Sequence, residues 1–287
     1  MLRPLGRGTI DRVDTPKINH LSLCSGYGGL DLGLRGVLDT CRTVAYVESE
    51  AWACANLVAK MEENALDSAP LWTDLTTFNG KEFCGSVDIL SAGFPCQPFS
   101  TAGRRATDSD NRYLLPHVLR CVQQVNPYWV LFENVDGIIF TKTSNGVPVL
   151  LHVLSHLERQ GYRAAWGIFS AAEIGSPQRR KRTFVLAHTR NTYCPELLSA
   201  DRWAEKIAEI KELGQHGNQW PAGRGEQQKT WERPRTEVKR RVGRAAYGGA
   251  YRMDKRLDRL RMLGNGAVPA VVEKAFLHLY GELAAFV

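Results

Sequence analysis

A cysteine between two prolines is the first candidate for a reactive group in this sequence. In the stretch GFPCQPFS (residues 93–100), Cys96 lies between Pro95 and Pro98, directly after the apolar run of residues 87–92. Proline fixes φ and donates no hydrogen bond to a sheet, so the two prolines end the strand and hold the thiol in a defined loop. A nucleophile loop and a tight structural turn fit these eight residues equally well.

Charged side chains accompany two further predicted strands. The stretch LFENVDGI places Glu133 and Asn134 at the carboxyl end of an apolar strand, where open α/β sheets bind ligands. The stretch GSPQRRKRTFVLA places Arg180 and Arg182 at alternate positions entering another strand, so both side chains project from one face. In isolation, Glu133 also fits a turn cap, and a solvated basic edge strand is favoured for the arginines.

A glycine-rich turn between a strand and a helix marks a third candidate site. In LSLCSGYGGLDLGL, Gly26, Gly28 and Gly29 let a ligand approach bare backbone and the helix N-terminus. The next predicted strand ends at Glu48, about 20 residues downstream, where nucleotide-binding sheets place an acid on the ribose hydroxyls. Asp74 lies beyond a third candidate strand. The alternative for the glycines is a plain strand-to-helix connection.

Secondary-structure patterns predict the elements that must position these groups. Short apolar runs alternate with helical patterns through the first two-thirds of the chain, which is typical of an α/β fold with a mostly parallel sheet and helices on both faces. Strands are predicted at residues 20–23, 43–47, 87–92, 129–132, 164–169 and 183–187. Leucine and valine at helical spacing predict core helices at residues 115–122 and 150–157.

The alternation stops at residue 188, where the composition becomes polar, glycine-rich and basic and indicates an inserted module. One helix is predicted within it, with Gly214 as its stop and an apolar face of Trp203, Ile207, Ile210 and Leu213. A last helix follows Asn265, and its apolar stripe over residues 268–279 is broad enough to pack back on the sheet.

Composition restricts the function classes. A chain of 287 residues with 44% hydrophobic content builds a substantial core, and a net charge of +7 with a pI of about 9.1 favours nucleic acid as an anionic partner. The seven cysteines form no C-x-x-C pair, which suits a reducing compartment and predicts no metal site. No apolar run reaches the roughly 18 residues of a membrane span, and residues 1–17 lack the apolar stretch of a signal peptide. We therefore expect a cytoplasmic protein without a membrane partner.

Taken in this order, the motifs resemble those of the DNA cytosine-5 methyltransferases. The resemblance is most specific for three stretches, Pro95-Cys96-Gln97, Glu133-Asn134-Val135 and Gln178-x-Arg180-x-Arg182. It implies a Rossmann-like methyltransferase core that depends on S-adenosyl-L-methionine, in residues 1–187. It further implies a short, irregular target-recognition region in residues 188–258 and a C-terminal helix in residues 259–287 that returns to the core.

The resemblance also implies residue roles. Cys96 would form a covalent bond to carbon 6 of a flipped-out cytosine, and Glu133 would stabilise charge at ring nitrogen 3. Arg180 would favour the thiolate, and Arg182 would hold the base or its sugar edge. The implied cofactor-binding residues are Ser25, Gly26, Tyr27, Gly28, Gly29, Leu30, Glu48, Ser49, Asp74, Leu75, Pro95, Asn265 and Ala267. The implied DNA-contacting residues are Gln97, Ser100, Asn134, Gln178, Lys239, Arg240 and Arg241.

Double-stranded DNA is the implied substrate, methylated at specific sites as in restriction-modification or phage self-protection. A cognate restriction endonuclease is a candidate partner, and we expect a monomer. RNA cytosine-5 methylation and a non-catalytic DNA-binding relative are the alternatives. Two departures concern the cofactor site: Ser22-Leu23-Cys24 stands where the family usually has Asp-Leu-Phe, and Ser49 follows Glu48 where Trp or Asp is common.

Overall fold

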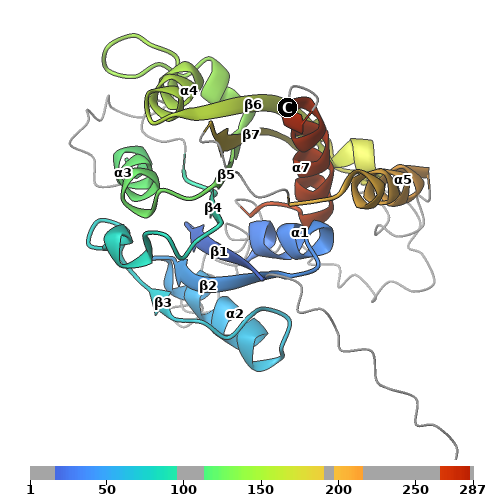
Figure 1. The fold of residues 1–287 in the computed structure, drawn as a ribbon, viewed down its shortest axis with the longest axis horizontal. Helices are drawn as coiled ribbons and strands as arrows, with labels where there is room; N and C mark the ends of the chain where they lie inside the picture. The colour runs from blue at the N-terminus through green and yellow to red at the C-terminus, as the bar shows by residue number, and fades with distance from the viewer. Residues whose placement is uncertain (1–16, 96–112, 191–196, 216–265, 285–287) are drawn as a thin grey trace, which may run out of the picture.

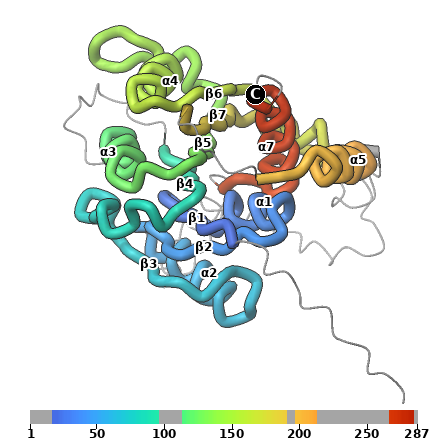
Figure 2. Tube along the Cα trace, viewed as in Figure 1, coloured from blue at the N-terminus to red at the C-terminus, as the bar shows by residue number. Residues whose placement is uncertain are grey.

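The computed structural model of the chain describes residues 17–95, 113–190, 197–215 and 266–284. These residues form one sheet of seven strands in the order β3-β2-β1-β4-β5-β7-β6 (Figures 1 and 2). The strands are β1 (Ile18–Leu23), β2 (Cys41–Val47), β3 (Leu71–Trp72), β4 (Ile89–Ala92), β5 (Trp129–Val135), β6 (Tyr162–Ser170) and β7 (Lys181–Thr189). Strands β1 to β5 pair in parallel, whereas β7 is antiparallel to β5 and β6. The predicted, mostly parallel sheet is confirmed.

Helices cover both faces of this sheet (Figure 1). On one face, α3 (Leu115–Val125) and α4 (Val149–Arg159) pack against Phe132 and its neighbours. The opposite face carries Tyr46 and Leu131, which are covered by α1 (Gly29–Val37), α2 (Ala51–Glu62) and α7 (Pro269–Ala284). Successive residues of a strand point to opposite faces of the sheet. Because helices cover both faces, side chains on both sides of the strands are buried and mostly apolar.

The strand order reverses between β1 and β4, because β2 and β3 lie on one side of β1 and β5 lies beyond β4. Open α/β sheets bind ligands outside the carboxyl ends of the strands at such a reversal. The glycine turn follows β1 and the stretch that leads to Cys96 follows β4, so the two motifs leave the sheet at neighbouring strand ends. The sheet thus brings together two motifs that lie about 70 residues apart in the chain, which places the candidate site at the reversal.

The predicted helices are present, with one boundary corrected. The patterns at residues 115–122, 150–157 and 268–279 correspond to α3, α4 and α7. The helix predicted beyond residue 188 is α5 (Ala200–Gln215), which continues through Gly214, so the predicted stop at that glycine is wrong. A single glycine costs a helix only about 1 kcal/mol, which neighbouring packing offsets. None of the helices in the described ranges is long and apolar enough to span a bilayer.

Helix α5 packs on the core. The Trp203 Nε1–H donates to the Leu277 carbonyl oxygen of α7 at 2.9 Å, and Ile210 is buried in the same apolar cluster as α1 and α7. Arg202 pairs with Asp39 at 2.6 Å, beyond the end of α1. Strand β7 also runs to Thr189, two residues past the expected boundary at 187. The division of the chain at residues 187 and 258 stays a prediction, because residues 191–196 and 216–265 lie outside the described ranges.

Candidate active site

The turn between β1 and α1 brings backbone groups to the edge of the sheet. Gly26 and Gly28 have φ of 56° and 82°, in the left-handed region that favours glycine. Gly28 is the N-cap of α1 and makes no side-chain capping bond. An uncapped helix N-terminus presents unsatisfied N–H groups and a positive dipole end, so the turn suits a polar or anionic ligand.

Two predicted carboxylates stand at the ends of β2 and β3. Glu48 accepts a hydrogen bond from the Gly26 N–H at 2.7 Å and another from the Glu50 N–H at 2.8 Å. These donors occupy half of the roughly four acceptor positions of a carboxylate. Asp74 Oδ1 accepts hydrogen bonds from the Thr76 N–H at 2.8 Å and the Thr76 hydroxyl at 2.7 Å, and these bonds lower the pKa of Asp74. Backbone N–H groups therefore hold both carboxylates, and one of these groups, that of Gly26, comes from the glycine turn.

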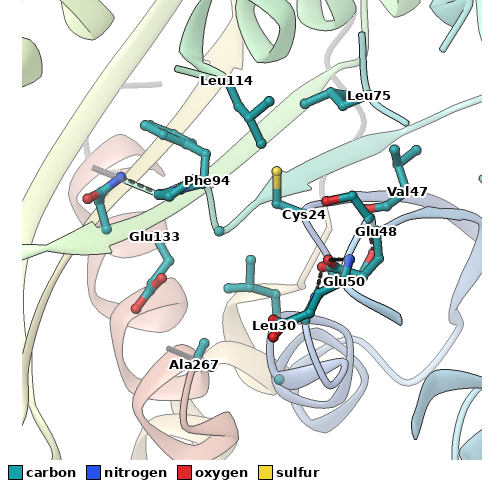
Figure 3. A pocket seen from close by; sticks show the side chains of 18 of the residues that line it. Cys24, Leu30, Val47, Glu48, Glu50, Leu75, Phe94, Leu114, Glu133 and Ala267 are labelled. Atoms are coloured by element: carbon teal, nitrogen blue, oxygen red, sulfur yellow. Dashed lines mark hydrogen bonds between the residues drawn. The ribbon is translucent and has the colours of Figure 1, made fainter. Parts of the chain in front are cut away.

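A cavity of about 660 Å³ connects these groups with the ends of β4 and β5 (Figure 3). Ten of the predicted cofactor-binding residues line it: Ser25, Gly26, Gly29, Leu30, Glu48, Ser49, Asp74, Leu75, Pro95 and Ala267. The predicted catalytic residues Glu133 and Arg182 line the same cavity, as does Asn134. Tyr27, Gly28 and Arg180 do not belong to its lining. The tertiary structure thus joins the glycine turn and the Glu-Asn-Val motif in one space.

Glu133 and Arg182 form a buried ion pair in the wall of the cavity. The Arg182 Nε lies 2.9 Å from Glu133 Oε1, and their side chains are 15% and 6% exposed. Antiparallel pairing places Glu133 opposite Phe184 and Arg182 opposite Val135 on adjacent strands, so the two side chains meet diagonally on one face. The pair lies near the carboxyl end of β5, where open α/β sheets bind ligands.

Burial sets the protonation of Glu133. Desolvation raises the pKa of Glu133 to about 7, although the nearby Arg182 and Arg180 guanidinium groups oppose this rise. A carboxyl group with a pKa near neutrality exchanges a proton readily at physiological pH. Glu133 is therefore suited to proton exchange in the cavity that it lines.

Arg180 and Arg182 have different surroundings despite their alternate spacing. Arg180 precedes β7 and donates from Nη2 to the Gly266 carbonyl oxygen, whereas Arg182 lies within β7 and faces Glu133. Burial lowers the pKa of Arg180, and the neighbouring Arg182 lowers it further. The two arginines thus connect the Gln-x-Arg-x-Arg motif to different parts of the site.

Asn134 acts on the backbone that leads to Cys96. Its Nδ2 donates to the Phe94 carbonyl oxygen at 2.8 Å, and its Oδ1 accepts from the Val135 N–H at 2.9 Å. The side chain is 4% exposed, which makes both bonds difficult to replace by water. Asn134 therefore fixes the chain two residues before the predicted nucleophile, while its implied contact with DNA stays a prediction.

Comparison with known proteins identifies the family. The model of the C-5 cytosine-specific DNA methylase family matches residues 18–261. The chain belongs to this family. It is 32% identical over 178 residues to the Type II methyltransferase M.NgoMIV of Neisseria gonorrhoeae, covering 62% of this chain and 53% of that protein. It is 31% identical over 175 residues to the Type II methyltransferase M.NaeI of Lentzea aerocolonigenes, covering 61% and 40%. The chain thus spans about half the length of the curated relatives that it matches.

A solved structure supports the fold. The crystal structure of a mutant of Spodoptera frugiperda DNMT2 superposes with a TM-score of 0.50 and 22% sequence identity, covering 64% of this chain and 54% of that chain. At this identity the likeness concerns the arrangement of the sheet and helices. It agrees with the expected Rossmann-like methyltransferase core.

Several residues that the family resemblance singled out lie outside the described ranges: Cys96, Gln97, Ser100, Lys239, Arg240, Arg241 and Asn265. Their roles stay predictions. Gln178 is described and exposed, and its N–H donates to the Ser176 hydroxyl at 3.2 Å.

Further cavity-lining residues were missed by sequence reasoning: Cys24, Val47, Glu50, Thr76, Gly93, Phe94, Leu114, Val135 and Gly266. Most are apolar or backbone contributors next to residues that were predicted, so only their position after a strand end would have signalled them. Leu114 carries no such signal, because it precedes α3 and reaches the cavity only through packing.

Proposed function

We propose that this chain transfers a methyl group from S-adenosyl-L-methionine to carbon 5 of a flipped-out cytosine in double-stranded DNA. The observation that carries this proposal is the buried Glu133–Arg182 pair in the wall of the cavity that the glycine turn also lines. Membership of the C-5 cytosine-specific DNA methylase family supports it, and the matched relatives are named Type II methyltransferases.

The residues of the cavity fit S-adenosyl-L-methionine. The volume of about 660 Å³ lies within the roughly 300–1,000 Å³ of small-molecule sites. Glu48 offers carboxylate acceptors to the ribose hydroxyls, and Asp74 and Leu75 line the same cavity where the adenine would lie. The turn at Gly26 and Gly29 leaves backbone accessible to the methionine end. When bound there, the cofactor supplies an electrophilic methyl group.

The residues of the chain would prepare the cytosine for that group. Carbon 5 of cytosine is a weak nucleophile, so the Cys96 thiolate would add to carbon 6 and make the ring electron-rich. Cys96 is bonded to Pro95, which lines the cavity, and one peptide unit spans only about 3.8 Å. Glu133 would hold a proton at ring nitrogen 3, and Arg182 would orient the base beside it. Loss of the carbon 5 proton and elimination of Cys96 would then restore the ring.

Radiolabelled methyl transfer tests this function directly. The full chain is incubated with labelled S-adenosyl-L-methionine and either duplex DNA or transfer RNA, and the modified cytosines are mapped. We expect label at cytosine carbon 5 in duplex DNA and none with Cys96→Ser. Label on transfer RNA alone would overturn the DNA assignment in favour of RNA methylation. DNA binding without label on either substrate would indicate a non-catalytic DNA-binding relative.

The partners follow from the same proposal. Double-stranded DNA is the macromolecular substrate, and the basic residues Lys239, Arg240 and Arg241 are proposed to contact its phosphates. A cognate restriction endonuclease and a monomeric state stay predictions from the sequence. The first is tested by whether cells that express a candidate endonuclease survive only when this chain is also expressed. The second is tested by light scattering of the purified chain.

A further inference from the structure

Gly266 and Ala267 form part of the cavity wall (Ala267 is labelled in Figure 3), and hydrogen bonds from two other parts of the chain hold them in place. The Tyr27 hydroxyl donates to the Ala267 carbonyl oxygen, and the Arg180 guanidinium donates to the Gly266 carbonyl oxygen. Both carbonyls precede α7, which begins at Pro269, so helical hydrogen bonds do not use them. Side chains of the glycine turn and of the arginine motif therefore hold the segment before α7.

Tyr27 fits its position closely. A Cβ atom on Gly266 would lie 1.7 Å from Tyr27 Cε1, and a Cβ atom on Gly29 would lie 2.1 Å from the Ala267 carbonyl oxygen. Only glycine allows the two segments to approach to this distance. On the turn side, Lys60 Nζ lies 4.7 Å from the centroid of the Tyr27 ring and donates to the Tyr27 carbonyl oxygen. The ring is thus confined by Lys60 and by the backbone of Gly266.

Tyr27 does not line the cavity, although the residues that it fastens do. We propose that Tyr27 is a positioning residue. Its hydrogen bond to Ala267, here called the latch, holds the Gly266–Ala267 wall against the glycine turn and thereby sets the affinity of the chain for S-adenosyl-L-methionine. This inference rests on the proposed function. A wall that is already in place when the cofactor arrives costs no ordering free energy on binding, so loss of the latch weakens binding without altering the reacting groups.

The test removes the hydroxyl alone. Tyr27→Phe keeps the ring on Gly266 and deletes the bond to Ala267, which is worth about 0.5–1.5 kcal/mol, or roughly 2- to 12-fold in affinity. We expect the dissociation constant for S-adenosyl-L-methionine, measured by calorimetry, and the KM for it to rise by that factor. We expect kcat at saturating cofactor to stay within about twofold.

Tyr46→Phe is the matched control. The Tyr46 hydroxyl also donates to a backbone carbonyl oxygen, that of Asp67 at 3.1 Å, but Tyr46 packs with Leu57 and Leu66 and does not line the cavity. This variant should lose similar stability and keep cofactor affinity and KM. Equal effects of Tyr27→Phe and Tyr46→Phe on affinity would overturn the latch, because a general loss of stability would then explain both.

A double-mutant cycle tests the contact itself. Gly266→Ala should weaken cofactor binding in the wild-type background and do so much less in Tyr27→Ala, because the ring that the new methyl group meets is gone. Additive effects would overturn direct contact. Hydrogen exchange without cofactor gives an independent measurement: amides at the start of α7 should exchange faster in Tyr27→Phe than in Tyr46→Phe.

The outcomes separate the latch from the proposed function. If the wild-type chain binds S-adenosyl-L-methionine and Tyr27→Phe binds it equally well, the latch is overturned and the proposed function stands. If the wild-type chain does not bind it, the proposed function fails, and the role of Tyr27 in affinity fails with it. Faster exchange at α7 in Tyr27→Phe would then show a fastening contact without a cofactor role.

Discussion

Replacing Glu133 by glutamine should change how the stability of the protein depends on pH. Glu133 is buried, and its pKa rises from 4.5 to about 7 because burial disfavours the charged form. The unfolded chain releases this proton near pH 4.5, whereas the folded chain keeps it until about pH 7. The folded state therefore binds more protons between these values, and stability must fall as pH rises through them.

The magnitude follows from the two pKa values. A rise from 4.5 to about 7 corresponds to about 3 kcal/mol at roughly 1.4 kcal/mol per pKa unit. Of this, about 2.5 kcal/mol is lost between pH 5 and pH 8. Glutamine has similar shape and no titrating group, so Glu133→Gln lacks this component. The attraction to Arg182 acts on the charged form of Glu133, so it is already contained in the pKa of about 7 and adds no separate pH-dependent contribution.

Urea unfolding of both proteins at pH 5 and pH 8 measures the effect. The free energy of unfolding of Glu133→Gln, relative to wild type, should increase by about 2.5 kcal/mol from pH 5 to pH 8. Glu62→Gln, on the exposed side of α2, is the matched control for replacing a carboxylate by an amide. A change below about 0.5 kcal/mol for Glu133→Gln would refute the argument that burial dominates the pKa of this carboxyl group.

Three further outcomes are expected. Cys96→Ser should abolish turnover and leave cofactor affinity nearly unchanged, since a serine hydroxyl is far less acidic than a thiol; turnover within about tenfold of wild type would contradict the nucleophile assignment. Replacing Lys239, Arg240 and Arg241 together by alanine should weaken binding to every duplex alike. The slope of log affinity against log salt concentration should become shallower by about 2.7, and an unchanged slope would indicate a solvated linker. Gly33→Ala should lower the free energy of unfolding by about 1–3 kcal/mol because its methyl group would lie 2.5 Å from Val272 Cβ. Gly36→Ala in the same helix meets only the flexible end of Glu273 and should not destabilise; equal thermal midpoints for the two variants would contradict this packing.

The sequence by itself determined the elements and the chemistry of single motifs. Periodicity predicted six strands of the sheet and the helices α3, α4 and α7, because burial of one face imposes a repeat that the chain shows directly. The cysteine between prolines, the glycine turn and the Glu-Asn-Val motif were identified from residue types alone, since each is a local constraint on backbone or side-chain chemistry. The spacing of Glu48 from the turn also predicted its place, and its carboxylate bonds to Gly26.

The tertiary structure alone decided which of these groups act on one another. Arg180 and Arg182 look equivalent in the sequence, yet one fastens Gly266 and the other meets Glu133 on an antiparallel neighbour. Strand order and register choose such partners, and neither is encoded in local periodicity. The pKa of Glu133 depends on burial by layers that come from distant parts of the chain, so no local pattern could supply it. Local sequence patterns specify which groups are available for chemistry, and the packing of the sheet and its helices determines their distances and charges.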